Sequence, residues 1–368
     1  MDQEWRTPSR QPVIGGTLDE GVRMSEAPQE EVLAALERVL GDRIVRSPTR
    51  EGGPLATVSP TSAEEVELVA KTAARYSVAL HAQGAGTGPE TGVAAEGSIL
   101  LRFDLMRGLR MPERGEPWVD AGPGASWLEL DDNLSVSGLG LAVYPTSAPR
   151  ATVGGWLAQD GLGVGSFEYG WLHENVLSAD VVLPGGERLT VKGDELRSVV
   201  RPESGEGIVV GARLRTRSAD DLPYALEFSQ AEEMVRAAED IFGLPLWHLG
   251  LLNAEMAKAR SLGDGHLLFG AYPRERGSEI EDSLRGVASS HGGRINSPAD
   301  AYRTWGERFF PVTPSHPTPV VTDRLLAPLD GVGESLEKLS ARAVQGAVAR
   351  SSEVLLLALD ANDDGRTP

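Results

Sequence analysis

Three glycine-rich stretches in the first half of the chain hold the residues best suited to bind an anion. The first follows an apolar run and reads Gln83, Gly84, Ala85, Gly86, Thr87 and Gly88. Glycine permits positive φ and lets backbone N–H groups approach an anion, and Thr87 adds a hydroxyl donor. The stretch is neither a dinucleotide fingerprint, because its third glycine comes too early, nor a P-loop, because it lacks Gly-Lys-Ser/Thr. Taken alone, such a loop is more often a tight turn than a ligand site.

The second and third glycine-rich stretches lie close together, at residues 145–158 and 161–166. The second offers hydroxyl groups and the adjacent Gly154 and Gly155, and we expect a short helix to begin there. A helix start with free N–H groups suits a pyrophosphate. The alternative is a long structural loop, but two glycine-rich loops of similar chemistry in one domain favour a ligand site.

The elements around these stretches alternate between strands and helices. Apolar spacing predicts helices at 28–40 and 127–134. Between them we expect another helix, with Thr61 or Ser62 as N-cap and Val66, Leu68, Val69 and Ala73 on one side. Predicted strands lie at 56–58, 78–82, 99–103, 118–122, 177–183, 188–191 and 208–217. The composition changes near residues 218–221. Beyond it, strands at 222–228 and 266–272 alternate with helices at 231–242 and 278–291, which suggests a ferredoxin-like α+β layer.

Composition narrows the function further. The 368 residues carry a net charge of −19 and no cysteine, which excludes disulfides, thiolate zinc sites and iron–sulfur clusters within the chain. Such a charge disfavours nucleic-acid and membrane-surface roles, although it also serves solubility. We see no signal peptide and no apolar stretch near the roughly 20 residues that span a bilayer. We therefore expect a cytoplasmic protein with no membrane span and no nucleic-acid partner.

The order of these motifs resembles the FAD-binding domain of the PCMH type, also called the vanillyl-alcohol-oxidase type. It is closest to the FAD subunits of glycolate oxidase and D-lactate dehydrogenase. The resemblance rests on five features over about 160 residues: the loop at 82–88, Pro145 with residues 151–155, the glycine-rich stretch with Tyr169 and Gly170, the strand and Pro-Gly-Gly at 176–186, and residues 207–209. It implies an α+β fold with a two-subdomain FAD-binding domain at 28–217, after a flexible tail at 1–27. A ferredoxin-like α+β cap, or substrate, domain at 218–368 would follow, shortened at its C-terminus.

The resemblance also implies a role for individual residues. Those of the first stretch, Gly84, Ala85, Gly86, Thr87 and Gly88, would wrap the pyrophosphate of FAD. The cofactor path would be lined by Pro145, Thr146, Thr152, Val153, Gly154, Gly155 and Ala158. Gly163, Gly165 and Ser166 would approach the flavin from the other side. Backbone groups at Gly207, Ile208 and Val209 would contact it as well.

We expect the FAD to be noncovalent. Some relatives tether the flavin through a loop histidine or a cysteine, and the loops here hold neither. His81 lies upstream of the first stretch and His173 downstream of the third. We interpret each as a surface or supporting residue rather than a tether.

In the second half, the stretch from Trp305 to Phe310 resembles the Trp-x-x-Arg of D-2-hydroxyacid enzymes, in which the arginine pairs with the substrate carboxylate. Arg308 is the matching catalytic candidate. The alternative, equally weighted, is an arginine stacked on Trp305 or paired with Glu307. The histidine motif that supplies metal ligands and catalytic histidines in relatives is not found, and we expect no metal. The acidic residues at 360–364 are interpreted as a tail rather than a calcium loop.

Two functions remain open from the sequence, besides a third and weaker one, a binding module that has lost its flavin. One is an FAD-dependent oxidoreductase, similar to glycolate oxidase or D-lactate dehydrogenase, that oxidises a small 2-hydroxy acid. The other is a non-catalytic or electron-transfer FAD subunit of a glycolate-oxidase-like complex, with an iron–sulfur or second flavoprotein subunit as partner. Without the histidine motif, the candidates for the proton acceptor are Tyr302, His316 and Glu307.

Overall fold

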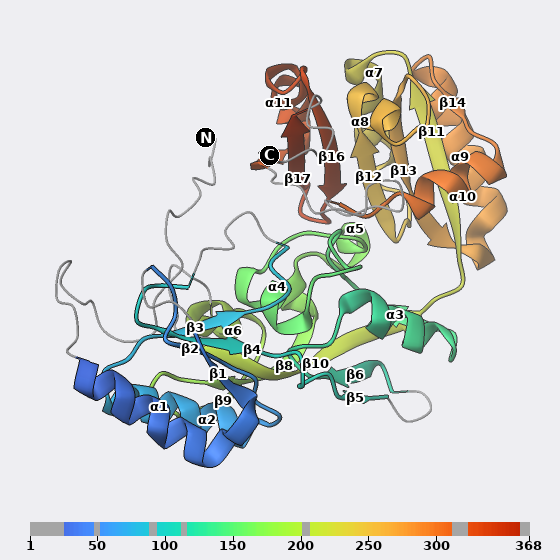
Figure 1. Cartoon of the computed structure of the whole chain (residues 1–368). Helices are drawn as coiled ribbons and strands as arrows, with labels where there is room; N and C mark the ends of the chain where they lie inside the picture. Colours follow the sequence, from blue (N-terminus) through green and yellow to red (C-terminus); the bar gives the residue numbers. More distant parts are fainter. Residues whose placement is uncertain are drawn as a thin grey trace.

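A computed structural model of the chain contains three β-sheets with helices packed against them (Figure 1). The structure describes residues 26–47, 52–87, 94–111, 116–200, 207–310 and 323–360. The first two sheets form the N-terminal part, up to Ser218. The third sheet forms the C-terminal part, which begins at Asp221.

The first sheet has four strands in the order β1-β2-β4-β3. Its strands are β1 (Ile44–Arg46), β2 (Ala56–Val58), β3 (Leu80–Gln83) and β4 (Ile99–Arg102). Strand β4 lies between β2 and β3 and is parallel to both. Helices α1 (Glu26–Leu40) and α2 (Ala63–Arg75) bury their apolar sides in the same core. The Ser62 hydroxyl accepts the Glu65 N–H, so Ser62 is the N-cap of α2.

The second sheet is antiparallel and has the order β5-β6-β10-β8-β9, with β7 paired to the end of β10. Its strands are β5 (Leu109–Arg110), β6 (Trp118–Ala121), β7 (Leu139–Leu141), β8 (Val176–Val182), β9 (Arg188–Val191) and β10 (Ile208–Ser218). Val182, Ile208 and Val210 pack into the core of the first sheet, which joins the two sheets. The glycine-rich stretches at 145–158 and 161–166 connect β7 to β8.

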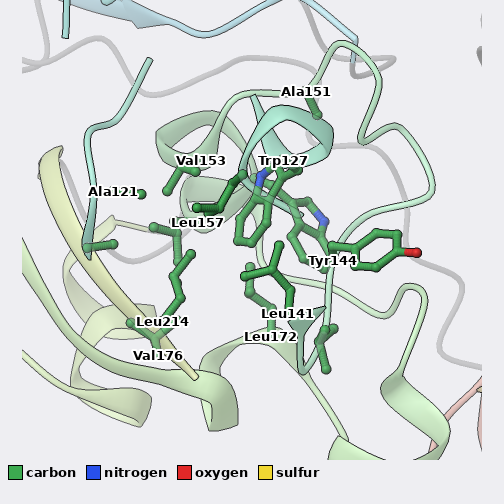
Figure 2. Packing of buried hydrophobic residues seen from close by; sticks show 14 of the residues in the cluster. Ala121, Trp127, Leu141, Tyr144, Ala151, Val153, Leu157, Leu172, Val176 and Leu214 are labelled. Atoms are coloured by element: carbon green, nitrogen blue, oxygen red, sulfur yellow. The ribbon is translucent and has the colours of Figure 1, made fainter. Parts of the chain in front are cut away.

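The helices of this region are α3 (Trp127–Ser135), α4 (Val153–Gln159), α5 (Ser166–Tyr169) and α6 (Gly193–Val200), with a 3₁₀ turn at Leu172–Asn175. The Trp127 ring is completely buried and meets the edge of Trp156 at 5.1 Å between centroids. Figure 2 shows Trp127 in the middle of this core and Tyr144 at its border. The core therefore fixes the loops on either side of α4.

The third sheet has seven strands in the order β14-β11-β13-β12-β16-β17-β15, and all its pairs are antiparallel. The elements β11 (Asp221–Phe228), α7 (Ala231–Ile241), β12 (His248–Leu252), β13 (His266–Pro273), α9 (Gly277–Ser290) and β14 (Arg294–Ile295) follow one another in the chain. This is the βαββαβ order of a ferredoxin-like unit, as the sequence predicts. The sequence missed β12 and β14.

Three more strands extend this sheet beyond the ferredoxin-like unit. They are β15 (Asp323–Pro328), β16 (Arg342–Val348) and β17 (Glu353–Asp360), with α11 (Val332–Lys338) between the first two. Helices α7, α9 and α11 cover one face, and α8 (Ala254–Ala259) and α10 (Pro298–Gly306) lie on the other. Helix α5 of the N-terminal part contacts β12 and β16 (Figure 1). Asp360, expected in an acidic tail, ends β17 instead, and residues 361–368 lie outside the described residues.

No helix in the described ranges is both long enough and apolar enough to cross a membrane.

Candidate functional site

The first two glycine-rich stretches lie against each other. Gly84 directly follows β3, and a Cβ atom added to it would come 2.5 Å from Thr152 Oγ1 and 3.3 Å from the Gly155 Cα. Gly86 has a φ of +69°, a conformation that favours glycine. The sequence therefore needs glycine here for the close approach of the two stretches and for the turn. Gly88 lies outside the described residues.

The start of α4 is already hydrogen-bonded within the protein. Thr152 is its N-cap and accepts the Gly155 N–H at 3.3 Å. The N–H groups of Val153 and Gly154 donate to the Ala125 and Pro123 carbonyls at 2.8 and 2.9 Å. The free N–H groups expected at this helix start are therefore in use, and Ala158 lies half-buried farther along the helix. Among the described residues, the N–H groups of residues 85–87 show no backbone acceptor.

The third stretch lies against the segment that opens the second. Val164 pairs with Tyr144 through two hydrogen bonds, of 3.1 and 2.8 Å. A Cβ atom on Gly163 would overlap the Tyr144 carbonyl, and one on Gly165, at φ +90°, would overlap the Ala142 carbonyl. The Ser166 hydroxyl accepts the Gly163 N–H at 2.9 Å. The structure thus brings the third stretch beside the buried Pro145 and Thr146.

Residues 207–209 open β10 at the border between the two N-terminal sheets. The Gly207 N–H donates to the Val199 carbonyl at 2.8 Å. Ile208 and Val209 pair with Val182 and Val181 on β8, and both side chains are buried. Their predicted contact with a flavin stays a prediction.

Arg308 follows α10 and meets Tyr144, the residue before Pro145. Its Nε donates to the Tyr144 hydroxyl at 2.9 Å, and its Nη1 donates to the Trp305 carbonyl at 3.0 Å. Its guanidinium also lies 4.6 Å from the Trp305 ring centroid and 4.2 Å from that of Phe309. The stacking on Trp305, which was the alternative to a substrate role, is therefore present, and the substrate role stays a prediction.

His248 and Trp247 belong to the same cluster, although the sequence did not single them out. His248 lies on β12 and is 1% exposed, and its Nδ1 accepts the Gly165 N–H at 3.4 Å. Burial, helped by the charge of Arg308, lowers the pKa of His248 to about 3, so the ring is neutral and carries its proton on Nε2. The Trp247 Nε1 donates to the Ala142 carbonyl at 3.1 Å. A single histidine inside an apolar run belongs to no motif, so the sequence alone does not mark it as functional.

The three predicted proton acceptors have different surroundings. Tyr302 is 54% exposed on α10, which places it at the surface. Glu307 is buried, and its backbone carbonyl accepts from the Arg260 guanidinium. His316 lies outside the described residues.

The two histidines considered as flavin tethers are both buried, which excludes a surface position and leaves the supporting role as a prediction. Burial lowers the pKa of His81, on β3. His173 lies 2.8 Å from Asp160 through its Nδ1 and 3.4 Å from Asp194 through its Nε2. His173 therefore connects the end of α4 to α6. In the described part of the chain, no three histidine or acidic residues group closely enough to hold a metal ion.

Comparison with known proteins places the glycine-rich stretches in a family. A family model described as an FAD binding domain matches residues 54–192. The mitochondrial cytochrome D-lactate dehydrogenase of Arabidopsis thaliana is 26% identical over 266 residues, which are 65% of this chain and 46% of that protein. The D-lactate dehydrogenase of Archaeoglobus fulgidus is 32% identical over 142 residues, 38% of this chain and 32% of that protein. The chain thus spans less than half the length of these relatives.

The fold agrees with solved structures over nearly the whole chain. The structure of p-cresol methylhydroxylase with substrate bound matches with a TM-score of 0.73 at 14% identity, covering 95% of this chain and 86% of that one. At this identity the likeness speaks for the fold alone. Together with the family match, it means that residues 54–192 are an FAD binding domain of the PCMH type.

Proposed function

We propose that this protein is an FAD-dependent oxidoreductase that oxidises a small 2-hydroxy acid, with FAD held noncovalently. The observation that carries the proposal is the position of Arg308. Its guanidinium contacts Tyr144, and Tyr144 pairs with the third glycine-rich stretch and precedes the second. A cation suited to a carboxylate therefore lies beside segments predicted to line the flavin.

The residues of the N-terminal part fit FAD. Gly84 and Gly155 let the first two glycine-rich stretches approach closely, and Gly86 turns the loop with a positive φ. The N–H groups of residues 85–87 would hold the pyrophosphate, with Thr87 adding its hydroxyl. Backbone donors of this kind offset two negative charges without a lysine, which suits a chain of net charge −19. Bound FAD would supply the hydride acceptor.

The role of Arg308 is to hold and orient the acid. A planar guanidinium binds both oxygens of a carboxylate, and aromatic faces restrict its motion. Its contacts with the Tyr144 hydroxyl and the Trp305 carbonyl are to neutral oxygens, so its positive charge stays available.

His248 does not supply the base that the reaction needs. Its ring is neutral, and its Nδ1 lone pair is already directed at the Gly165 N–H. Within the described residues, His248 is the only histidine in contact with the rings around Arg308. This supports the second candidate function, an electron-transfer FAD subunit of a glycolate-oxidase-like complex.

Spectroscopy of the purified protein separates the two candidates. We expect flavin absorbance, and bleaching on anaerobic mixing with D-lactate or glycolate in a stopped-flow instrument. Arg308→Lys should slow this reduction and leave the flavin content unchanged, because lysine keeps the charge but loses the two-oxygen contact. Arg303→Lys, on the exposed side of α10, is the matched control.

Three results would change the proposal. Folded protein that takes up no FAD would refute the cofactor assignment. Bound flavin that no 2-hydroxy acid reduces would favour the electron-transfer subunit. Equal reduction rates in Arg308→Lys and in the control would show that Arg308 is structural.

A further inference from the structure

We propose that Tyr144 and Gln345 are positioning residues, which fix the guanidinium and the backbone of Arg308 so that it receives a carboxylate in one orientation. The inference rests on the proposed function and extends it to residues that the sequence did not single out. Three residues from distant parts of the chain, Tyr144, Arg260 and Gln345, make hydrogen bonds to Arg308 or to the neighbouring Glu307.

Gln345 holds the backbone of Arg308. It lies on β16 with 2% of its surface exposed, and its Nε2 donates to the Arg308 carbonyl at 2.7 Å. Its Oε1 accepts from the Nη2 of Arg260 at 2.7 Å. Both ends of this buried amide are therefore occupied, and the side chain has one orientation available.

Arg260 also holds the backbone of this segment in place. It is 4% exposed, and besides Gln345 its guanidinium donates to the Glu307 carbonyl. The two consecutive carbonyls of Glu307 and Arg308 are thus held by two buried side chains. Two residues later, the Phe310 N–H donates to the Thr146 carbonyl at 2.8 Å, which attaches the same segment to the second glycine-rich stretch.

Tyr144 holds the side chain of Arg308. Its hydroxyl accepts from Nε at 2.9 Å, and Figure 2 shows that hydroxyl directed away from the core around Trp127. Burial raises the pKa of Tyr144 to about 12, so the hydroxyl remains neutral. A neutral partner orients the guanidinium without neutralising it, whereas a carboxylate partner would compete with a substrate.

One carboxylate does lie in the electrostatic range of Arg308. Asp131, on α3, feels the charges of both Arg308 and Arg217, and burial raises its pKa. Its Oδ1 accepts the Leu141 N–H at 2.9 Å. In the described part of the chain it makes no hydrogen bond to Arg308, and the Nη2 of Arg308 has no partner there. The Nη2 side of the guanidinium is therefore the side that we assign to the incoming anion.

Binding of oxalate tests the inference without turnover. Oxalate is a small dicarboxylate that has no hydroxyl-bearing carbon to oxidise, and the FAD-loaded protein can be titrated with it by calorimetry. Tyr144→Phe and Gln345→Met should each raise the oxalate Kd about tenfold, the scale of one hydrogen bond to a charged group. Flavin content should stay at the wild-type level. With an oxidisable acid, KM should rise by a similar factor while kcat changes less.

Two controls give the experiment its specificity. Tyr272→Phe removes a buried tyrosine hydroxyl on the opposite side of the third sheet and should leave the Kd unchanged. In an Arg308→Ala background, Tyr144→Phe should have no further effect on the Kd, because the hydroxyl acts through Arg308.

The outcomes are distinguishable. If the wild type binds oxalate and both variants bind it equally well, the positioning role is wrong while the proposed function stands. An equal loss from Tyr144→Phe with and without Arg308 would also overturn it. If the FAD-loaded wild type binds no oxalate and no 2-hydroxy acid reduces the flavin, the proposed carboxylate site itself fails.

Discussion

Gly84 lies so close to Thr152 that even a methyl group cannot be added there without moving the loop. Gly84→Ala adds a single methyl group, which would lie 2.5 Å from Thr152 Oγ1 and 3.3 Å from the Gly155 Cα. Methyl and hydroxyl groups normally stay at least about 3.4 Å apart, so the loop and the start of α4 must separate by about 1 Å. The group in the way belongs to a β-branched side chain that caps a helix, so it cannot rotate aside without losing that cap.

The cost follows from two sources. Overpacking a well-packed contact costs about 1–3 kcal/mol of unfolding free energy. The same shift displaces the loop whose N–H groups are proposed to hold the pyrophosphate. We therefore expect Gly84→Ala to lower the free energy of unfolding by about 2 kcal/mol and to weaken FAD binding by at least tenfold.

A second substitution tests whether Thr152 is the cause. Thr152→Ala alone removes the N-cap of α4 and should cost about 1 kcal/mol. Combined with Gly84→Ala, it removes the atom that the new methyl group meets. The double variant should then be more stable than the sum of the two single effects allows, by about 1 kcal/mol.

Urea unfolding of the flavin-free proteins and fluorescence titration with FAD provide the measurements. Gly53→Ala is the matched control, because a Cβ atom there meets nothing within 4 Å and its φ is not in the positive range. Strict additivity of Gly84→Ala and Thr152→Ala would refute the reasoning, and so would a Gly84→Ala protein as stable as the Gly53→Ala control.

Three further predictions follow from the site and its surroundings. Gly86→Val should abolish FAD binding while the C-terminal part stays folded, because φ +69° strains a β-branched residue. Flavin content and near-ultraviolet circular dichroism measure the two effects, and an unchanged flavin content would contradict the prediction. The folded-state pKa of His248, about 3, lies below its unfolded value of 6.5, so stability should fall as pH drops below 6.5 by up to about 1.4 kcal/mol per pH unit, and His248→Gln should flatten that slope in urea titrations. The hydrogen bond from Arg43 lowers the pKa of Glu65 to about 2, so the stability from this pair is complete above about pH 4.5 and is lost as pH falls toward 2; acid unfolding of Glu65→Gln that kept the wild-type slope over this range would contradict the assignment.

Local patterns predicted much of the N-terminal part. The run that forms β8 is closed by Pro184-Gly185-Gly186, and Gly186 adopts a φ of +79° in the turn before β9. Ser62 caps α2 as its position before Glu64 and Glu65 indicated. These elements are set by residues next to one another in the chain, so the sequence alone contains the information needed.

The C-terminal part was predicted less completely because its pairings are distant. Every residue of β12 is buried, so the strand lacks the alternation that marks a half-exposed strand. Its pairing with β16 joins residues almost a hundred positions apart, so no pattern of neighbouring residues predicts it. For the same reason the sequence indicated Arg308 as a candidate but not Tyr144, His248 or Gln345, which meet it only in the folded chain. The role of Arg308 itself stays a prediction.

The N-terminus of α4 differs from what its glycine motif predicted. Two adjacent glycines at a helix start suggested free N–H donors, yet the Ala125 and Pro123 carbonyls accept two of these N–H groups. Those carbonyls belong to the turn after β6, some thirty residues earlier in the chain. The glycines serve close packing there, and Gly154 has Pro123 within reach of any added Cβ atom.

The pairing of β12 with β16 also has a consequence for the order of events during synthesis. Gln345, which holds the Arg308 carbonyl, lies on a strand that is synthesised after the glycine-rich stretches. Non-local strand pairs form slowly because loop closure must precede them. A nascent chain should therefore be able to bind flavin before it can orient a carboxylate. Pulse-labelling hydrogen exchange during refolding with FAD should show β8 and β10 protected ahead of β16.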